Sequence, residues 1–234
     1  MWQLHPNEAS VCLPRMSAKV CPQRPWQGVR EIRYGRRDVP ATVLRIQLPG
    51  ECVERAPKEL YIRGSDLIAT YPDLEPGRVR CQIYWRCVSL PEWRAEGFDL
   101  ILSVQTDLLD SHPDLTVTSQ HHHATGWKSR AFATVAMPGE ASKPSADAPP
   151  ACFVTWDDGI TYVEMIHPRG DGRLVIAPQS ETRESQWQLF GGPLEKGVLR
   201  RSCLRGLFLP TEDADAAAEA IYRDLIASPL PLTT

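Results

Sequence analysis

The sequence predicts an all-β protein: an antiparallel β-sandwich or related two-sheet architecture of about eight to eleven strands, with one C-terminal α-helix. Three observations support this fold class. Proline is frequent, at 21 of 234 residues, and proline interrupts helices while tolerating turns and strand ends. Several segments alternate apolar and polar residues, the period of a strand with one buried face. Only one segment, near the C-terminus, has the spacing of a helix.

Length and composition limit the classes of protein to be considered. The hydrophobic share of 42% and the charged share of 24% are typical of a globular protein. The net charge of −3, with acids and bases mixed along the chain, argues against nucleic acid as a partner. We see no apolar leader and no apolar run long enough to span a membrane. We therefore expect a cytoplasmic protein without membrane contact, whose seven cysteines are mostly buried thiols.

The predicted strands follow one another from residue 29 onward, after an irregular N-terminal segment over residues 1–28 that carries four prolines. We expect residues 29–234 to form a single β-rich domain with a flexible Pro/Ala/Ser-rich loop at about 137–150. The predicted strand segments are 41–49, 59–63, 66–72, 78–88, 98–109, 115–120, 151–156, 160–166, 173–178 and 198–210. Asp158-Gly159 predicts a hairpin with a type I′ turn. Residues 211–228 predict the helix, with Thr211 as its cap and Ile221 and Leu225 on one face.

Segment 78–88, "RVRCQIYWRCV", separates into two rows when alternate residues are taken together. The apolar row, Val79 to Cys87, predicts a core-facing side. The polar row consists of Arg80, Gln82, Tyr84 and Arg86. We expect this segment to pair with 98–109 as an antiparallel hairpin that sets Ile83 opposite Val104 and brings Arg80 beside Asp107. Cross-strand pairing explains the polar row, and recognition of a hydroxyl-rich ligand is the alternative.

Neither a metal nor a cofactor is predicted. His121 and His123 would project from the same side of a strand, as metal ligands often do, but no complete ligand set accompanies them. We interpret them as part of a polar loop, and a metal site completed by His167 or Glu164 is the alternative. The glycine-rich "GGPLEKG" segment has the wrong order for a phosphate-binding loop.

The candidate site residues lie where two predicted strands end. Tyr162 and Glu164 share one strand face, and His167 follows at the end of that strand, while segment 191–201 contributes charges of both signs. Sites often lie at such sheet rims. We predict catalytic roles for Glu164, His167 and Glu195, and ligand-binding roles for Lys196, Arg200 and Tyr162. The alternative is a salt-bridged surface corner.

Three function classes follow from these features. The first is a binding or accessory module that recognises a small polar ligand such as a saccharide. The second is a carbohydrate-active enzyme that uses Glu/His acid–base chemistry. The third is a protein-interaction scaffold, for which a homodimer through an exposed sheet face is one form.

Overall fold

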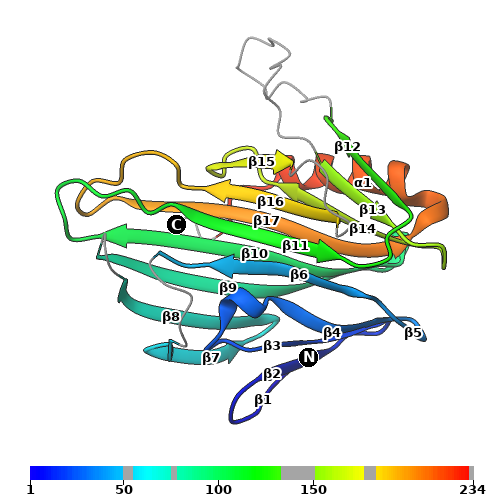
Figure 1. Cartoon of the computed structure of the whole chain (residues 1–234), viewed down its shortest axis with the longest axis horizontal. Coiled ribbons are helices and arrows are strands. Elements are labelled where there is room, and N and C mark those ends of the chain that lie inside the picture. Colours follow the sequence, from blue (N-terminus) through cyan, green and yellow to red (C-terminus); the bar gives the residue numbers. More distant parts are fainter. Residues whose placement is uncertain (50–54, 75–77, 133–150, 177–182, 232–234) are drawn as a thin grey trace.

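The chain folds into two antiparallel β-sheets packed face to face, with an α-helix on the outside of one of them (Figure 1). The computed structural model describes residues 1–49, 55–74, 78–132, 151–176 and 183–231. The predicted all-β, two-sheet architecture with a C-terminal helix is therefore confirmed. The described ranges contain 17 strands, more than the predicted number of about eight to eleven, because several of the strands are only two to five residues long.

The first sheet has nine strands in the order β1-β2-β3-β4-β6-β11-β16-β15, with β5 paired to β4. Every pair in it is antiparallel. Its strands are β1 (Trp2–Leu4), β2 (Ala9–Cys12), β3 (Met16–Val20), β4 (Val29–Tyr34), β5 (Arg37–Asp38), β6 (Ala41–Gln47), β11 (Leu115–His121), β15 (Gly172–Ile176) and β16 (Arg183–Leu189).

The second sheet has eight strands in the order β12-β13-β14-β17-β10-β9-β8-β7. Three 12-residue strands, β9, β10 and β17, form its centre. Its strands are β7 (Glu59–Arg63), β8 (Asp66–Leu74), β9 (Val79–Leu90), β10 (Ala95–Thr106), β12 (Gly126–Arg130), β13 (Ala151–Thr155), β14 (Ile160–Ile166) and β17 (Leu199–Pro210).

The main hydrophobic core lies between the two sheets. The apolar row of β9 faces it as predicted, with Val79, Cys81, Ile83 and Trp85 fully buried. Trp187 enters the same cluster from the facing sheet. The alternation read from the sequence thus identified the buried face of this strand.

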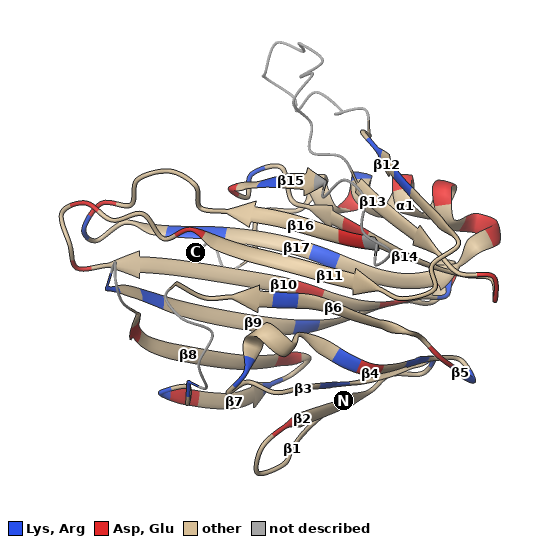
Figure 2. Ribbon diagram, in the orientation of Figure 1, with Lys and Arg blue, Asp and Glu red and all other residues tan. Residues whose placement is uncertain are grey.

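Helix α1 (Ala214–Ala227) covers the outer face of the second sheet. Ile221 and Leu225 are both buried, as their spacing predicted, in a cluster with Val163 of β14 and Leu207 of β17. Figure 2 shows basic β12 next to the acidic residues of α1. The ion pairs in this region are Lys128–Asp215 at 2.6 Å and Arg130–Glu219 at 3.1 Å.

The predicted cap of this helix was wrong. Thr211 belongs to the single-turn 3-10 helix η3 (Thr211–Asp213), and α1 begins only after Asp213. The Thr211 hydroxyl lies 2.9 Å from the hydroxyl of Thr161 on β14. Because β17 runs to Pro210 beside β14, Thr211 is still close enough to that strand to bond with it.

Residues 1–28, predicted to be irregular, instead contain β1, β2, β3 and the 3-10 helix η1 (Pro25–Gln27). These strands have three to five residues each. Runs this short show little alternation in the sequence, and Pro6 and Pro14 fall in the connections between them, where proline is tolerated.

The predicted pairing of β9 with β10 was right in its faces and wrong in its register by two residues. Ile83 lies opposite Leu102 rather than Val104. The strands are joined by the 3-10 helix η2 (Pro91–Trp93), which ends with Arg94 at a φ of 52°. Because Pro91 cannot donate to the ladder, pairing stops at Leu90 and Ala95.

The polar row of β9 is engaged by neighbouring strands. Arg80 lies 3.4 Å from Asp107, so the predicted proximity of these two side chains is confirmed despite the shift in register. Arg86 donates two hydrogen bonds to Asp66 at 2.8 and 3.0 Å, and Gln82 donates to Thr70. Cross-strand pairing therefore accounts for this row.

The hairpin at Asp158-Gly159 is confirmed, but its turn differs from the predicted type I′. Only Gly159 has a positive φ, of 80°, and its amide donates to the carbonyl of Trp156. This is a type I turn followed by a left-handed glycine, the usual three-residue hairpin.

The predicted flexible loop at 137–150 lies outside the described residues. Within the described ranges, no helix is both long enough and apolar enough to span a membrane.

Candidate ligand-binding site

Two neighbouring strands of the first sheet, β4 and β6, each contain a β-bulge. In β4, Glu31 has a φ of 51°, and in β6, Leu44 has a φ of 54°. Both positions coincide with a shift in the pairing register, against β3 and β11 respectively. Positive φ is unfavourable for these residue types by about 1–2 kcal/mol, and such strain and bulges are found at functional sites more often than elsewhere.

The bulges change which side chains face outward. Thr42 and Arg45 are three residues apart and would lie on opposite faces of a regular strand. Because β6 carries one extra residue between them, both pair with outward-facing residues of β11, Gln120 and Thr118. The bulge in β4 has the same effect on Arg30 and Arg33, which pair with Lys19 and Ser17 of β3.

The 3-10 helix η1 closes one side of this region. Its last residue is followed by Gly28, whose φ is 64°. A Cβ at this position would lie 2.5 Å from the carbonyl oxygen of Val43 and 2.7 Å from the Cγ of Arg45. Only glycine therefore lets η1 lie against β6, where Arg45 donates its Nε hydrogen to the Trp26 carbonyl at 3.1 Å.

These elements line an open pocket of about 540 Å³ on the outward face of the first sheet. We call it the arginine pocket. Its lining residues are Arg24, Trp26, Gln27, Arg30, Thr42, Arg45 and Gln120.

The charges of the arginine pocket are unevenly matched. Arg30 is held by Glu31 at 2.6 Å and by Glu8 at 3.1 Å. No carboxylate of a described residue lies within ion-pair distance of Arg45, which is half-buried. Arg45 thus presents a cation toward the pocket whose charge the described part of the chain does not neutralise.

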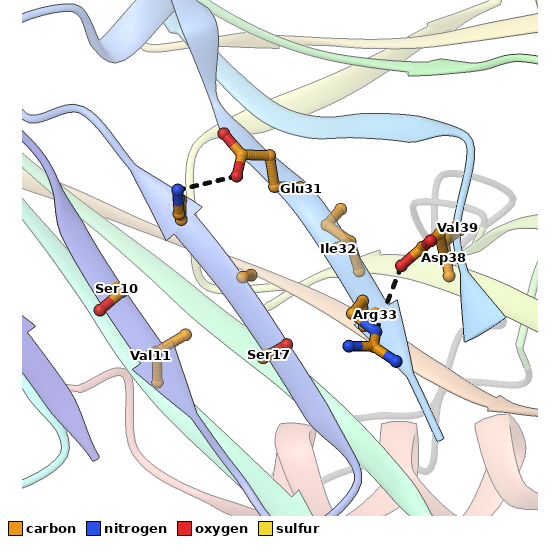
Figure 3. A pocket seen from close by; sticks show the side chains of 10 residues that line it. Ser10, Val11, Ser17, Glu31, Ile32, Arg33, Asp38 and Val39 are labelled. Atoms are coloured by element: carbon orange, nitrogen blue, oxygen red, sulfur yellow. Dashed lines mark ion pairs between the residues drawn. The ribbon is translucent and has the colours of Figure 1, made fainter. Parts of the chain in front are cut away.

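A second hollow lies on strands β2 to β5 of the same sheet (Figure 3). It has a volume of about 480 Å³. Its charged side chains form pairs with one another: Lys19 with Glu31 at 2.8 Å and Arg33 with Asp38 at 3.2 Å. These charges are already matched, so this hollow offers a ligand less than the arginine pocket does.

Beneath the bulge in β6, the carboxylate of Glu164 lies between the two sheets with 1% of its surface exposed. It accepts four hydrogen bonds. Tyr162 donates at 2.9 Å and Trp187 at 3.0 Å, and the hydroxyls of Ser119 and Ser185 donate to its two oxygens. Neither of the two pockets described above includes it.

The Glu164 cluster is connected to the arginine pocket through Ser119. The Ser119 hydroxyl donates to Glu164 and accepts the backbone N–H of Leu44, the bulge residue, at 2.9 Å. Ser119 has no cross-strand partner on β6, because the register shifts on either side of it. The buried Glu164 carboxylate thus holds Ser119 in the position from which its hydroxyl accepts the Leu44 amide, next to Arg45.

The predicted site residues fall in three places. Tyr162 and Glu164 are together on the inner face of β14. His167 lies just beyond this strand, on the helix side of the sheet, with its Nε2 3.0 Å from the Ser228 carbonyl oxygen and its Nδ1 accepting the Arg169 amide. Burial lowers the pKa of His167. The sheet therefore separates its ring from the Glu164 carboxylate.

Glu195, Lys196 and Arg200 lie between β16 and the start of β17. Glu195 and Lys196 are exposed. Arg200 forms an ion pair with Asp171 and donates to the Gly192 carbonyl at 3.0 Å. This segment thus meets the chain that follows β14 at Asp171, and no hydrogen bond or ion pair of the described residues joins Glu195, Lys196 or Arg200 to Glu164 or His167.

The three histidines of residues 121–123 separate at the end of β11. His121 is buried, with 1% exposed, and packs against the rings of Trp156 and Tyr162. His123 is exposed in the following turn, at a φ of 55°. The expectation that His121 and His123 share a face was therefore wrong, because the strand ends at His121. No group of three or more His, Cys, Asp or Glu side chains in the described part of the chain could hold a metal ion.

Sequence reasoning did not find the arginine pocket, because it assumed regular alternation. Under that assumption Arg45 lies on the same face of the strand as Val43, and Leu44 lies on the other face. The sequence signal for the bulge is the adjacent apolar pair Val43-Leu44, followed at once by an arginine. Both apolar side chains are fully buried in the structure. Gly28, next to a proline-initiated turn, was the second signal.

Two solved structures resemble this chain distantly. No family model and no curated protein matches the chain. A galactose mutarotase related enzyme from Lactobacillus acidophilus matches 87% of this chain and 97% of its own, with a TM-score of 0.48 and 6% identity. A chain named as a kojibiose phosphorylase, from the human microbiome, matches 81% of this chain and 27% of its own, with a TM-score of 0.41 and 10% identity. At such scores and identities, neither likeness informs the function of this chain.

Proposed function

We propose that this chain is a binding module, and that the arginine pocket takes a small, hydroxyl-rich molecule carrying a negative charge, such as an acidic saccharide. The observation that carries the proposal is the half-buried Arg45 side chain, which is held at a strained bulge without a carboxylate partner among the described residues. A chain maintains such strain only where the surrounding structure enforces it, as at ligand sites.

The other lining residues match the same ligand chemistry. The guanidinium of Arg45 can donate paired hydrogen bonds to a carboxylate or phosphate. The amides of Gln27 and Gln120 and the hydroxyl of Thr42 both donate and accept, as pairing with sugar hydroxyls requires. Trp26 is half-buried at the rim, where the apolar face of a sugar ring can pack on it.

The Glu164 cluster has a supporting role in this proposal. Both carboxylate oxygens are engaged by protein donors, so the group holds the inner face of β11 and, through Ser119, the bulge. A site on the Glu164 carboxylate itself would require these donors to be displaced, at a cost of about 1–3 kcal/mol for each buried group left unpaired.

The test is a thermal-shift screen of neutral sugars, uronic acids and sugar phosphates on the wild-type chain and on Arg45→Gln. A ligand at 100 times its dissociation constant stabilises the folded state by about 2.7 kcal/mol. We expect acidic compounds to raise the melting temperature of the wild type and to lose most of this effect on Arg45→Gln.

Arg33→Gln is the matched control, because Arg33 also points outward next to a bulge but lies outside the arginine pocket. It should leave the shift intact. The proposal fails if no acidic compound shifts the melting temperature, or if the shift survives Arg45→Gln.

A further inference from the structure

Strand β7 forms one edge of the second sheet, and its outer edge has no neighbouring strand in the described part of the chain. All five of its residues are exposed. Three consecutive large apolar residues are among them: Leu60, Tyr61 and Ile62, at 37%, 39% and 37% exposure. Exposed, apolar edge strands are normally shortened, charged or covered, because they pair readily with another strand.

The backbone groups of β7 that face away from β8 are those of Leu60 and Ile62. The amide of Cys87 on β9 donates to the carbonyl of Ser65, so the backbone groups of Ser65, just before β8, point toward β9. Because this direction alternates along an antiparallel strand, the even-numbered residues of β8 turn toward β7. Their partners are Glu59, Tyr61 and Arg63, which leaves the N–H and C=O groups of the two residues between them directed outward.

The same end of the sandwich carries further exposed apolar surface. Strand β1, the edge of the first sheet, lies near β7, since the Trp2 indole donates to the Ser65 carbonyl at 3.0 Å (Figure 1). Met1 and Leu4 are 85% and 42% exposed. Together with the three residues of β7 they make up five of the eight exposed large hydrophobic residues in the described ranges.

We propose that a second copy of this chain pairs with the first through β7, antiparallel and centred on Tyr61, so that the two second sheets join into one. This register places Leu60 opposite Ile62 of the partner subunit, with the outward backbone groups of both strands facing each other. It also places Glu59 opposite Arg63 of the partner subunit on the same face.

The charge pattern is what specifies a second copy of this chain rather than another strand. Neither Glu59 nor Arg63 has an ion-pair partner among the described residues of its own chain. The Arg63 guanidinium instead lies over the Tyr84 ring, 6.0 Å from its centre. In the proposed register each copy supplies the acid for the other's base, and the twofold symmetry of such an interface forms both pairs at once.

Sedimentation velocity over a range of protein concentrations tests the proposal with two charge reversals and their combination. Glu59→Arg and Arg63→Glu each set like charges opposite one another twice per dimer. We expect the wild type to dimerise and each single variant to raise the dimer dissociation constant by at least about tenfold, which is 1.4 kcal/mol. The double variant Glu59→Arg/Arg63→Glu restores opposite charges and should recover most of the wild-type affinity.

Arg36→Glu is the control, since it makes the same change of charge in an exposed turn of the first sheet, and it should dimerise as the wild type does. Circular dichroism of each variant checks that the strands are retained. A wild type that is monomeric at every concentration overturns the proposal. So does a dimer that neither single reversal weakens, or one that the double variant fails to restore.

Discussion

Ser119 is the single residue on which the geometry of the arginine pocket depends most. Its hydroxyl donates to the buried Glu164 carboxylate and accepts the amide of Leu44 at the bulge. Ser119→Ala removes one donor from a buried charge and leaves a buried N–H without a partner. We expect the free energy of unfolding to fall by about 2–4 kcal/mol, as measured by urea denaturation.

Ser129→Ala, in the exposed edge strand β12, provides the comparison. Surface substitutions of this kind usually change stability by less than about 0.5 kcal/mol. Equal effects of the two substitutions would contradict the role assigned to Ser119.

Among structural elements, η1 requires glycine at position 28 for two reasons, the positive φ and the lack of space for a Cβ atom. Gly28 and Gly35 have nearly the same φ, 64° and 65°, yet a Cβ would meet β6 at Gly28 and open space at Gly35. Gly35→Ala should therefore cost only about 1–2 kcal/mol, for the positive φ. Gly28→Ala should cost more, because η1 must also move away from β6.

Urea denaturation of both variants measures the difference. In the proposed function, Gly28→Ala also displaces Trp26 and Arg45 and so weakens the thermal shift caused by an acidic ligand, whereas Gly35→Ala does not. Matching stabilities for the two variants would show that η1 is not pressed against β6 as described.

The elements also show where sequence reasoning succeeds and where it fails. Period-two alternation identified β9, β10 and the inner face of β14, because strands of seven to twelve residues repeat their apolar and polar rows often enough to be recognised, even in β10 and β14, where nearly every residue is buried. It failed for β1 to β3, which have three to five residues. It also failed at the bulges in β4 and β6, where one extra residue reverses the pattern and hides Arg45 and Thr42.

For the whole molecule, burial of His121 between the sheets makes stability depend on pH. Burial lowers the pKa of His121 to about 3 in the folded chain, with a smaller contribution from His122, whereas a histidine in the unfolded chain has a pKa of about 6.5. Between these values the unfolded chain binds a proton that the folded chain does not. The contribution of His121 is therefore complete above about pH 6.5 and is lost progressively as the pH falls toward 3.

Urea denaturation at pH 8 and pH 5.5 measures this loss. We expect His121 to account for about 1.4 kcal/mol of the decrease in the free energy of unfolding, because pH 5.5 lies about one unit below the pKa of histidine in the unfolded chain. In His121→Leu this part should vanish, while the part due to His167, whose pKa burial also lowers, should remain. The exposed His5→Leu should behave as the wild type. A decrease that His121→Leu leaves unchanged would mean that the ring takes up its proton without unfolding.

The two-sheet architecture could be predicted because it follows from composition and the dominant period, which are properties of the whole chain. The order of strands within the sheets could not. The neighbours of β11, for example, are β6 and β16, and nothing in the local pattern of residues 115–121 selects them. The arginine pocket depends on the strand order as well, since its residues come from η1 and the preceding Arg24, from β4, from β6 and from β11.

That strand order has a consequence for how the chain acquires its structure. Strands β7 to β10 form a local meander that requires only residues 59–106 to assemble. The next strand beside β10, however, is β17, roughly a hundred residues further along. Closing a loop of that length costs chain entropy before the contacts between β10 and β17 form. We therefore expect slow folding, in milliseconds to seconds or longer, as for other proteins of high contact order. Until β17 arrives, the meander has two open edges, and a chaperone that shields β10 during synthesis would prevent the wrong strand from taking that place.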